Sequence, residues 1–162
     1  MIVAVSAAPV YDKGELVSRL ASTHGIDIVR DPAPRLCERY GFQTLYEMPP
    51  DLQRACRVQL LSEHLVDLQQ RNDVVFEYSV AEWIADWMRW FWPTTATQEW
   101  ERLMEVASTA AKRYDMIYHL DTGMPRSYDG YVWLDRANAR QIDSLVRFAY
   151  REFGVWELVR SS

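Results

Sequence analysis

Two side chains stand out because their types could bind anions or move protons, and each follows an apolar run. Lys13 follows the run in MIVAVSAAPVYDKGEL, and Glu77 ends the run in DVVFEYS. The chain has 18 basic residues, and Lys13 and Lys112 are its only lysines, so the position of each lysine is informative. A solvated lysine near a helix start is the alternative for Lys13, although the positive end of a helix makes that position slightly unfavourable.

The carboxylate of Glu77 is expected in a functional site. A carboxylate at the end of a strand buried on both faces is badly placed for solubility alone, and perturbed carboxylates gather at functional sites. The competing interpretation makes Glu77 an acid at a helix start, with Ser79 as the cap of the next helix. Both interpretations require a strand that ends at Glu77.

Five short β-like runs alternate with helical segments along the chain. The expected strands are Ile2–Ser6, Ile26–Arg30, Asp73–Glu77, Asp115–Leu120 and Val155–Val159. The expected helices cover about 14–24, 33–40, a long segment from Pro49-Pro50, two segments broken at Pro93, and about 135–153. Strands that alternate with helices predict a parallel sheet with right-handed crossovers, which is an α/β fold. No linker or repeat divides the chain, so residues 1–162 are expected to form a single domain.

The N-terminal loop resembles the start of small P-loop kinases, in which a strand leads into G-x-x-x-x-G-K-[ST] and a helix. Without gaps, Ala7 and Asp12 take the two glycine positions, Lys13 takes the lysine position, and Gly14 replaces the Ser/Thr. The resemblance implies a three-layer α/β/α fold with a five-stranded parallel sheet, and phosphate binding by Lys13, Asp12 and Gly14. The loop is degenerate, because Asp12 adds a negative charge and Gly14 lacks the hydroxyl that binds Mg²⁺.

Later segments are similar to the same family in family order. Asp31-Pro-Ala-Pro-Arg35 resembles the E-P-x-R segment, which implies that Asp31 and Arg35 face the acceptor substrate; a turn with an Asp cap is the alternative. Glu77 matches the carboxylate that acts as base or organises magnesium, which implies a catalytic role. Tyr78 replaces the arginine that follows this carboxylate, which places Tyr78 with the substrate-binding residues.

The segment after the fourth strand is similar to the lid of these kinases, where an arginine of D-G-x-R covers the phosphates. Here Arg126 precedes Asp129-Gly130, and Val132 stands at the arginine position. The resemblance implies that Arg126 or Arg140 takes over this catalytic contact. Asp129-Gly130 can also be a simple tight turn.

A tryptophan-rich segment, AEWIADWMRWFWPTTATQEW, lies between the third and fourth strands. Trp83, Trp87 and Trp90 follow an i, i+4, i+7 spacing, which places them on one face of a helix. Core packing is one interpretation, and an interface with a partner or a second copy is another. A platform for base stacking is a third, although the acidic chain disfavours it.

Composition limits the remaining function classes. The net charge of −5 disfavours a general nucleic-acid binder, and no run approaches the length of a membrane span. Cys37 and Cys56 form no C-x-x-C pair and the three histidines lie far apart, so a reducing cytoplasmic location and no metal site are expected.

The sequence supports three functional hypotheses. The first is a non-catalytic or catalytically altered kinase-fold protein that binds a nucleotide-like ligand or a protein partner. The second is an active nucleoside or nucleotide kinase that uses ATP and Mg²⁺. The third is a homodimeric structural or inhibitory protein that associates through the tryptophan-rich helix.

Overall fold

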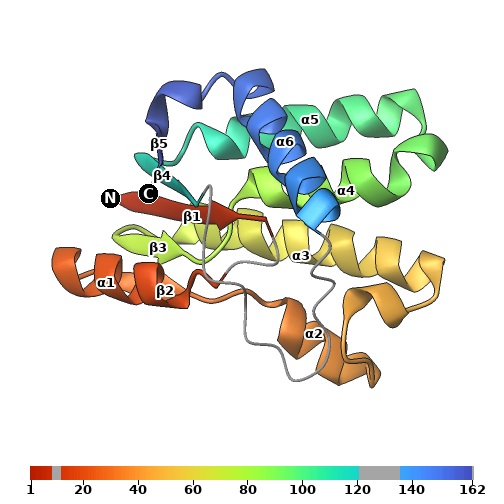
Figure 1. Cartoon of the computed structure of the whole chain (residues 1–162), viewed down its shortest axis with the longest axis horizontal. Coiled ribbons are helices and arrows are strands. Elements are labelled where there is room, and N and C mark those ends of the chain that lie inside the picture. The colour runs from red at the N-terminus through yellow and green to blue at the C-terminus, as the bar shows by residue number, and fades with distance from the viewer. Residues whose placement is uncertain (9–11, 121–135, 162) are drawn as a thin grey trace.

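Five parallel strands form one sheet in the order β2-β3-β1-β4-β5. This computed structural model describes residues 1–8, 12–120 and 136–161 (Figure 1). The strands are β1 (Ile2–Ala7), β2 (Asp27–Val29), β3 (Val74–Phe76), β4 (Met116–Leu120) and β5 (Val159–Ser161). The predicted α/β class with a five-stranded parallel sheet is therefore confirmed.

Six α-helices occur in the described parts of the chain: α1 (Gly14–His24), α2 (Ala33–Tyr40), α3 (Pro50–Gln70), α4 (Val80–Phe91), α5 (Thr97–Ala111) and α6 (Arg136–Glu152). Gly25 and Gly41 end α1 and α2 with φ of 65° and 76°, a left-handed conformation that favours glycine. Pro50 starts α3, where a missing N–H costs nothing. None of the described helices is long and apolar enough to cross a membrane.

The two faces of the sheet are covered by different helices. Successive side chains of β1 point to opposite faces, as in any strand. Val3 and Val5 pack with Leu20 and neighbouring residues of α1. Ile2 and Ala4 belong to the larger core cluster on the other face, beneath α3, α4, α5 and α6. Figure 1 shows α1 below β1 and α5 and α6 above it.

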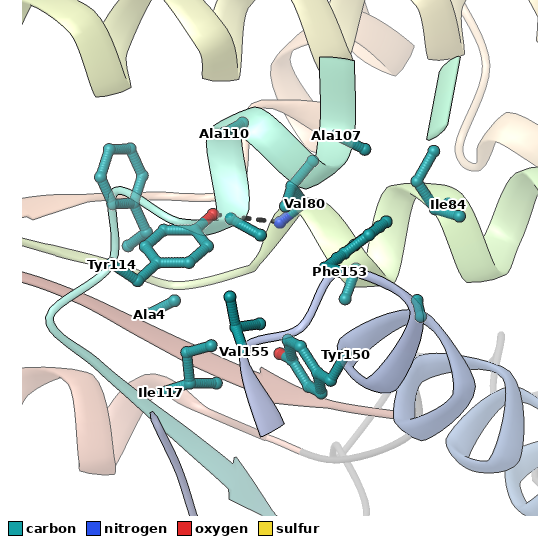
Figure 2. Close-up of a cluster of buried hydrophobic side chains, with 14 of the residues drawn as sticks. Ala4, Val80, Ile84, Ala107, Ala110, Tyr114, Ile117, Tyr150, Phe153 and Val155 are labelled. Carbon is teal, nitrogen blue, oxygen red and sulfur yellow. Dashed lines mark hydrogen bonds between the residues drawn. The ribbon is translucent and has the colours of Figure 1, made fainter. Parts of the chain in front are cut away.

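The larger core is built from branched aliphatic, alanine and aromatic side chains that pack together. Figure 2 shows Ala4 and Ile117 of the sheet facing Val80 of α4 and Tyr150 of α6. Tyr114 is buried, and its hydroxyl accepts a hydrogen bond from the Val80 N–H at 3.1 Å. Full burial of one such apolar side chain stabilises the fold by roughly 1.5–3 kcal/mol, so this cluster fixes α4 and α6 against the sheet.

The C-terminal strand differs from its predicted position. The expected strand at Val155–Val159 is wrong in its bounds, because Trp156–Leu158 forms a 3-10 turn and β5 begins at Val159. Val155 is apolar because it is buried in the core after α6, where its N–H donates to the Tyr150 carbonyl. Val155 therefore has the apolar character expected of a strand residue, although it lies outside the strand.

Candidate functional site

The carboxyl ends of β1 and β3 form the position in this sheet where a ligand site is expected. After β1 the chain passes into α1 on one face, and after β3 it passes into α4 on the opposite face. Two neighbouring strands whose connections leave to opposite faces create a crevice at their carboxyl ends, and open α/β sheets bind ligands there. Lys13 and Glu77 lie in the segments that come after these two strands.

Lys13 forms a buried ion pair with Glu82 of α4. Its ammonium nitrogen lies 2.6 Å from Glu82 Oε1, and the exposed fractions of the two side chains are 4% and 14%. The Ala7 N–H, at the end of β1, donates to the same oxygen over a longer 3.4 Å. Burial raises the pKa of Glu82 even though the Lys13 ammonium acts in the opposite direction. The lysine expected to bind phosphate is thus bonded to a carboxylate of the protein.

Glu82 is fixed in place by the start of α4. Its second oxygen, Oε2, accepts the Ser79 N–H at 2.7 Å, and the Ser79 side chain accepts the N–H of Glu82 in return. This capping box satisfies two backbone donors at once, and it holds the carboxylate in one orientation. The interpretation of Ser79 as the cap of α4 is therefore confirmed. The acid of this capping box is Glu82 and not Glu77.

Asp12 folds onto the next turn of the chain. Its Oδ1 accepts the Gly14 N–H at 2.8 Å, and the side chain is exposed. Gly14 is the first residue of α1, and a Cβ atom at this position would approach Asp12 Oδ1 to 3.2 Å. Asp12 thus occupies an N–H that the predicted phosphate loop would offer to an anion.

Glu77 connects the ends of β3 and β2. Its Oε2 accepts the Asp31 N–H at 3.1 Å, and its Oε1 lies 3.6 Å from the Arg30 guanidinium. Asp31 in turn accepts the Ala33 N–H at 2.9 Å, which starts α2. The structure therefore joins the Glu77 carboxylate to the backbone N–H of Asp31, and it gives the Asp31 side chain the turn-forming role of the alternative interpretation. The acceptor-binding role of Asp31 stays a prediction.

Tyr78 and Arg35 are the other two predicted substrate-binding residues, and they lie in different surroundings. Tyr78 is buried, with its ring centroid 4.7 Å from that of His64 and 5.1 Å from that of Trp83. Burial is the largest cause that raises the pKa of Tyr78. Arg35 is exposed on α2 and pairs with Glu63 of α3 at 3.1 Å.

Of the two arginines predicted to cover the phosphates, only Arg140 belongs to the described part of the chain, and no described contact joins it to Lys13. Arg140 is exposed on α6, and Arg126 lies outside the described residues. The predicted lid element Asp129-Gly130 also lies outside them.

The tryptophans of α4 are divided between the interior and the surface. Trp87 is buried, and its Nε1–H donates to Thr95 Oγ1 at 3.0 Å. Trp83 is half-buried and packs against the core. Trp90 is 38% exposed and lies against Tyr46, with ring centroids 5.3 Å apart. Of the three predicted interface residues, Trp90 has the most surface to offer a partner.

Three polar side chains with notable contacts were missed by sequence reasoning. Glu82 had a local signal, since Ser79-x-x-Glu82 is a capping-box pattern. His119 is joined to Ser6 at 2.8 Å and to Asp143 at 2.7 Å, and these contacts carry no local signal. Arg57 donates to Asp86 at 2.5 Å within the protein, and its Nη2 has no hydrogen-bond partner among the described residues. The described residues hold no group of three metal-binding side chains.

Comparison with known proteins identifies the fold. No protein-family model and no curated protein matches the chain. Two solved NadR structures superpose on 99% of it, one in complex with NAD and AMP-PNP at 14% identity and TM-score 0.71, the other in complex with NR at 15% and 0.70. The chain has the P-loop kinase-like α/β fold. It spans 43% of the length of these NadR chains.

Proposed function

We propose that this protein binds a nucleotide-like ligand through its nucleoside part, at the carboxyl ends of β1 and β3, without transferring phosphate. In this proposal the phosphate-binding loop is degenerate, and its lysine forms an ion pair within the protein instead of binding phosphate. The 2.6 Å ion pair between Lys13 and Glu82 is the observation that carries this proposal. A lysine held by a buried carboxylate is not available to stabilise the charge of a transferring phosphoryl group.

The other changes in the loop support the same conclusion. Gly14 has no hydroxyl to bind Mg²⁺, and phosphoryl transfer by P-loop proteins depends on that ligand. Asp12 places a second carboxylate beside the loop, where it repels a polyphosphate. Each change weakens a different part of the reaction, so a single compensating residue does not restore it.

The ligand class is supported by the fold and by the residues at the end of β3. The NadR structures that resemble this chain contain NAD, AMP-PNP and NR, all of which contain a nucleoside. Glu77 Oε2 accepts the backbone N–H of Asp31, so the two residues are neighbours at the ends of β3 and β2, and carboxylates at these positions suit the hydroxyl groups of a ribose. We assign the nucleoside-binding role to these two residues.

Calorimetric titration of nicotinamide riboside, NAD, ADP and ATP, each with and without magnesium, tests the proposal. We expect binding that is weakened at least about tenfold, or about 1.4 kcal/mol, by Glu77→Gln. The matched control is Glu105→Gln, the same chemical change at an exposed position of α5. A folded protein that binds none of the four ligands at millimolar concentration overturns the proposal.

An active nucleoside or nucleotide kinase is the second candidate. It is favoured by the placement of Lys13 and Glu77 after neighbouring strands, which brings a phosphate-binding lysine and a base to one crevice. Magnesium-dependent release of ADP from ATP, abolished by Lys13→Ala and retained in Lys112→Ala, would establish this activity. The same result would exclude a non-catalytic protein.

A further inference from the structure

Three hydrogen-bond donors of the predicted phosphate loop are bonded to carboxylates of the same chain. The Lys13 ammonium and the Ala7 N–H both donate to Glu82 Oε1, at 2.6 and 3.4 Å. The Gly14 N–H donates to Asp12 Oδ1 at 2.8 Å. In a functional P-loop the lysine and such inward N–H groups face phosphate oxygens instead. The protein therefore supplies its own anions where a ligand would supply phosphate.

Glu82 differs from an ordinary surface acid in how firmly it is held. Its Oε2 accepts the Ser79 N–H at 2.7 Å within the capping box of α4, so only Oε1 faces Lys13 and Ala7. The side chain is 14% exposed and that of Lys13 is 4% exposed, which leaves little water to screen their attraction. A phosphate that replaces this carboxylate must break a desolvated ion pair and leave Glu82 without a counter-ion beside a second anion.

We propose that Glu82 is a resident anion that occupies the phosphate position beside Lys13, and that it makes the wild-type protein reject ligands that place a phosphate in this loop. The inference rests on the proposed function for the identity of the ligand, and it narrows that ligand to one held by its nucleoside part. Glu82 is then a residue that determines specificity, because its charge excludes a phosphate from the position beside Lys13.

The competing explanation is that the ion pair is only structural. A capping residue that meets a buried lysine would stabilise α4 and would have no effect on ligand choice. The two explanations predict different results when the charge is removed and the cap is kept. If Glu82 is a resident anion, removal of its charge increases the affinity for phosphate. If the ion pair is only structural, removal of the charge lowers the stability and leaves this affinity unchanged.

Glu82→Gln separates the two explanations, because glutamine also serves at this position of a capping box and carries no charge. The probe is inorganic tripolyphosphate without magnesium, titrated by calorimetry into the full chain. We expect at least about a tenfold gain in affinity over wild type, and loss of that gain in Glu82→Gln/Lys13→Ala. Ser79→Ala is the matched control, since it removes the other half of the capping box and leaves the ion pair intact. Equal affinity of wild type and Glu82→Gln for tripolyphosphate overturns the inference.

Amine labelling provides a second measurement, with a control inside the chain. Lys13 is buried and Lys112 is exposed, and they are the only lysines, so the peptides that contain them report separately by mass spectrometry. In wild type we expect Lys13 to react more slowly than Lys112 and tripolyphosphate to leave both rates unchanged. In Glu82→Gln we expect faster labelling of Lys13 and protection by tripolyphosphate.

The wild-type protein can overturn the inference even if Glu82→Gln does not fold. Micromolar binding of tripolyphosphate to the wild type, with a changed labelling rate at Lys13, would show that the carboxylate does not exclude phosphate. Neither assay contains a nucleoside, so a failure here leaves the Glu77-dependent binding of nucleosides to be judged by its own titration. Conversely, a gain of tripolyphosphate binding stands even if no nucleoside binds.

Discussion

Ser6 and His119 face each other on neighbouring strands, with Ser6 Oγ 2.8 Å from His119 Nδ1 and both side chains fully buried. The other ring nitrogen of His119 lies 2.7 Å from Asp143 of α6, which also accepts a hydrogen bond from Arg147 at 2.8 Å. Burial acts to raise the pKa of Asp143, but the bonds from His119 and Arg147 outweigh it and hold that pKa below its ordinary value. A polar chain thus joins the end of β1 to α6 through the core.

Replacement of His119 tests how much this chain stabilises the fold. We expect His119→Leu to lower the free energy of unfolding by roughly 1–3 kcal/mol, because Ser6 loses a partner in the core and Asp143 loses one where it is partly buried. Ser6→Ala should cost about 1 kcal/mol, and the double variant should cost less than the sum, since the two residues share one bond. Urea denaturation measures all three. A loss for His119→Leu no larger than that for His24→Leu, at an exposed position of α1, would contradict this role.

His64 is expected to make stability depend on pH. Burial lowers the pKa of His64 from 6.5 to about 3, and its Nε2 lies 2.5 Å from the Tyr114 hydroxyl. The native protein therefore stays unprotonated at His64 while the unfolded chain takes up a proton below about pH 6.5. The contribution of His64 to the free energy of unfolding is fully present at neutral pH. It falls between about pH 6.5 and 3, by up to about 1.4 kcal/mol per pH unit.

Urea denaturation at pH 7 and pH 5 checks the contribution of His64. The difference in stability between the two pH values should shrink in His64→Gln and remain in His24→Gln, because His24 is exposed in the native protein. An equal difference in wild type and His64→Gln would show that other groups cause the pH dependence.

Much of the fold could be predicted from local signals in the sequence. Helices α1 and α2 have the predicted bounds because their ends are marked by Gly25 and Gly41, which adopt left-handed conformations. The strands appear as short apolar runs because they are buried within a parallel sheet. The last strand was misplaced because Val155, which is buried after α6, has the same apolar character as a strand residue.

The candidate site could be predicted only in part. Sequence order placed Lys13 and Glu77 after separate strands, and the sheet brings those strands together. The partner of Lys13 was not predictable, because Glu82 is 69 residues away and reaches it only since β3 pairs with β1. A local pattern indicates that Glu82 caps α4 through Oε2, but the contact of its Oε1 with Lys13 depends on the tertiary structure.

Removal of Lys13 without its partner should destabilise the protein strongly. We expect Lys13→Met to lower the free energy of unfolding by roughly 3–5 kcal/mol at pH 7, because an unpaired buried carboxylate remains at Glu82. Lys13→Met/Glu82→Gln should cost less than Lys13→Met alone. Thermal and urea unfolding measure both, with Lys112→Met as the control for loss of an exposed lysine.

The same variant should become relatively more stable as the pH falls. Burial already raises the pKa of Glu82 in the wild type, and loss of the Lys13 charge raises it further. The native state then binds a proton that the unfolded chain binds only at lower pH, so the stability deficit narrows from pH 7 toward pH 5. A deficit that stays constant over this range would show that Glu82 is not the group left uncompensated.

Trp87 and Trp90 of α4 should respond differently to truncation. Trp87→Ala should cost roughly 3–5 kcal/mol, because the ring is buried and the Arg54 guanidinium lies 4.9 Å from its centroid. Trp90→Ala should change stability by at most about 1 kcal/mol, because much of its ring is in water. Chemical denaturation compares the two variants.

Light scattering on the same proteins tests the homodimer hypothesis. Trp90, which lies against Tyr46, is the most exposed tryptophan of α4, whereas Trp87 offers almost no surface, so a dimer through this face is expected to use Trp90. Trp90→Ala should then convert such a dimer to a folded monomer. If Trp90→Ala remains folded and its mass equals that of the wild type, this face is not the contact between copies. Loss of folding in Trp90→Ala would contradict its placement at the surface.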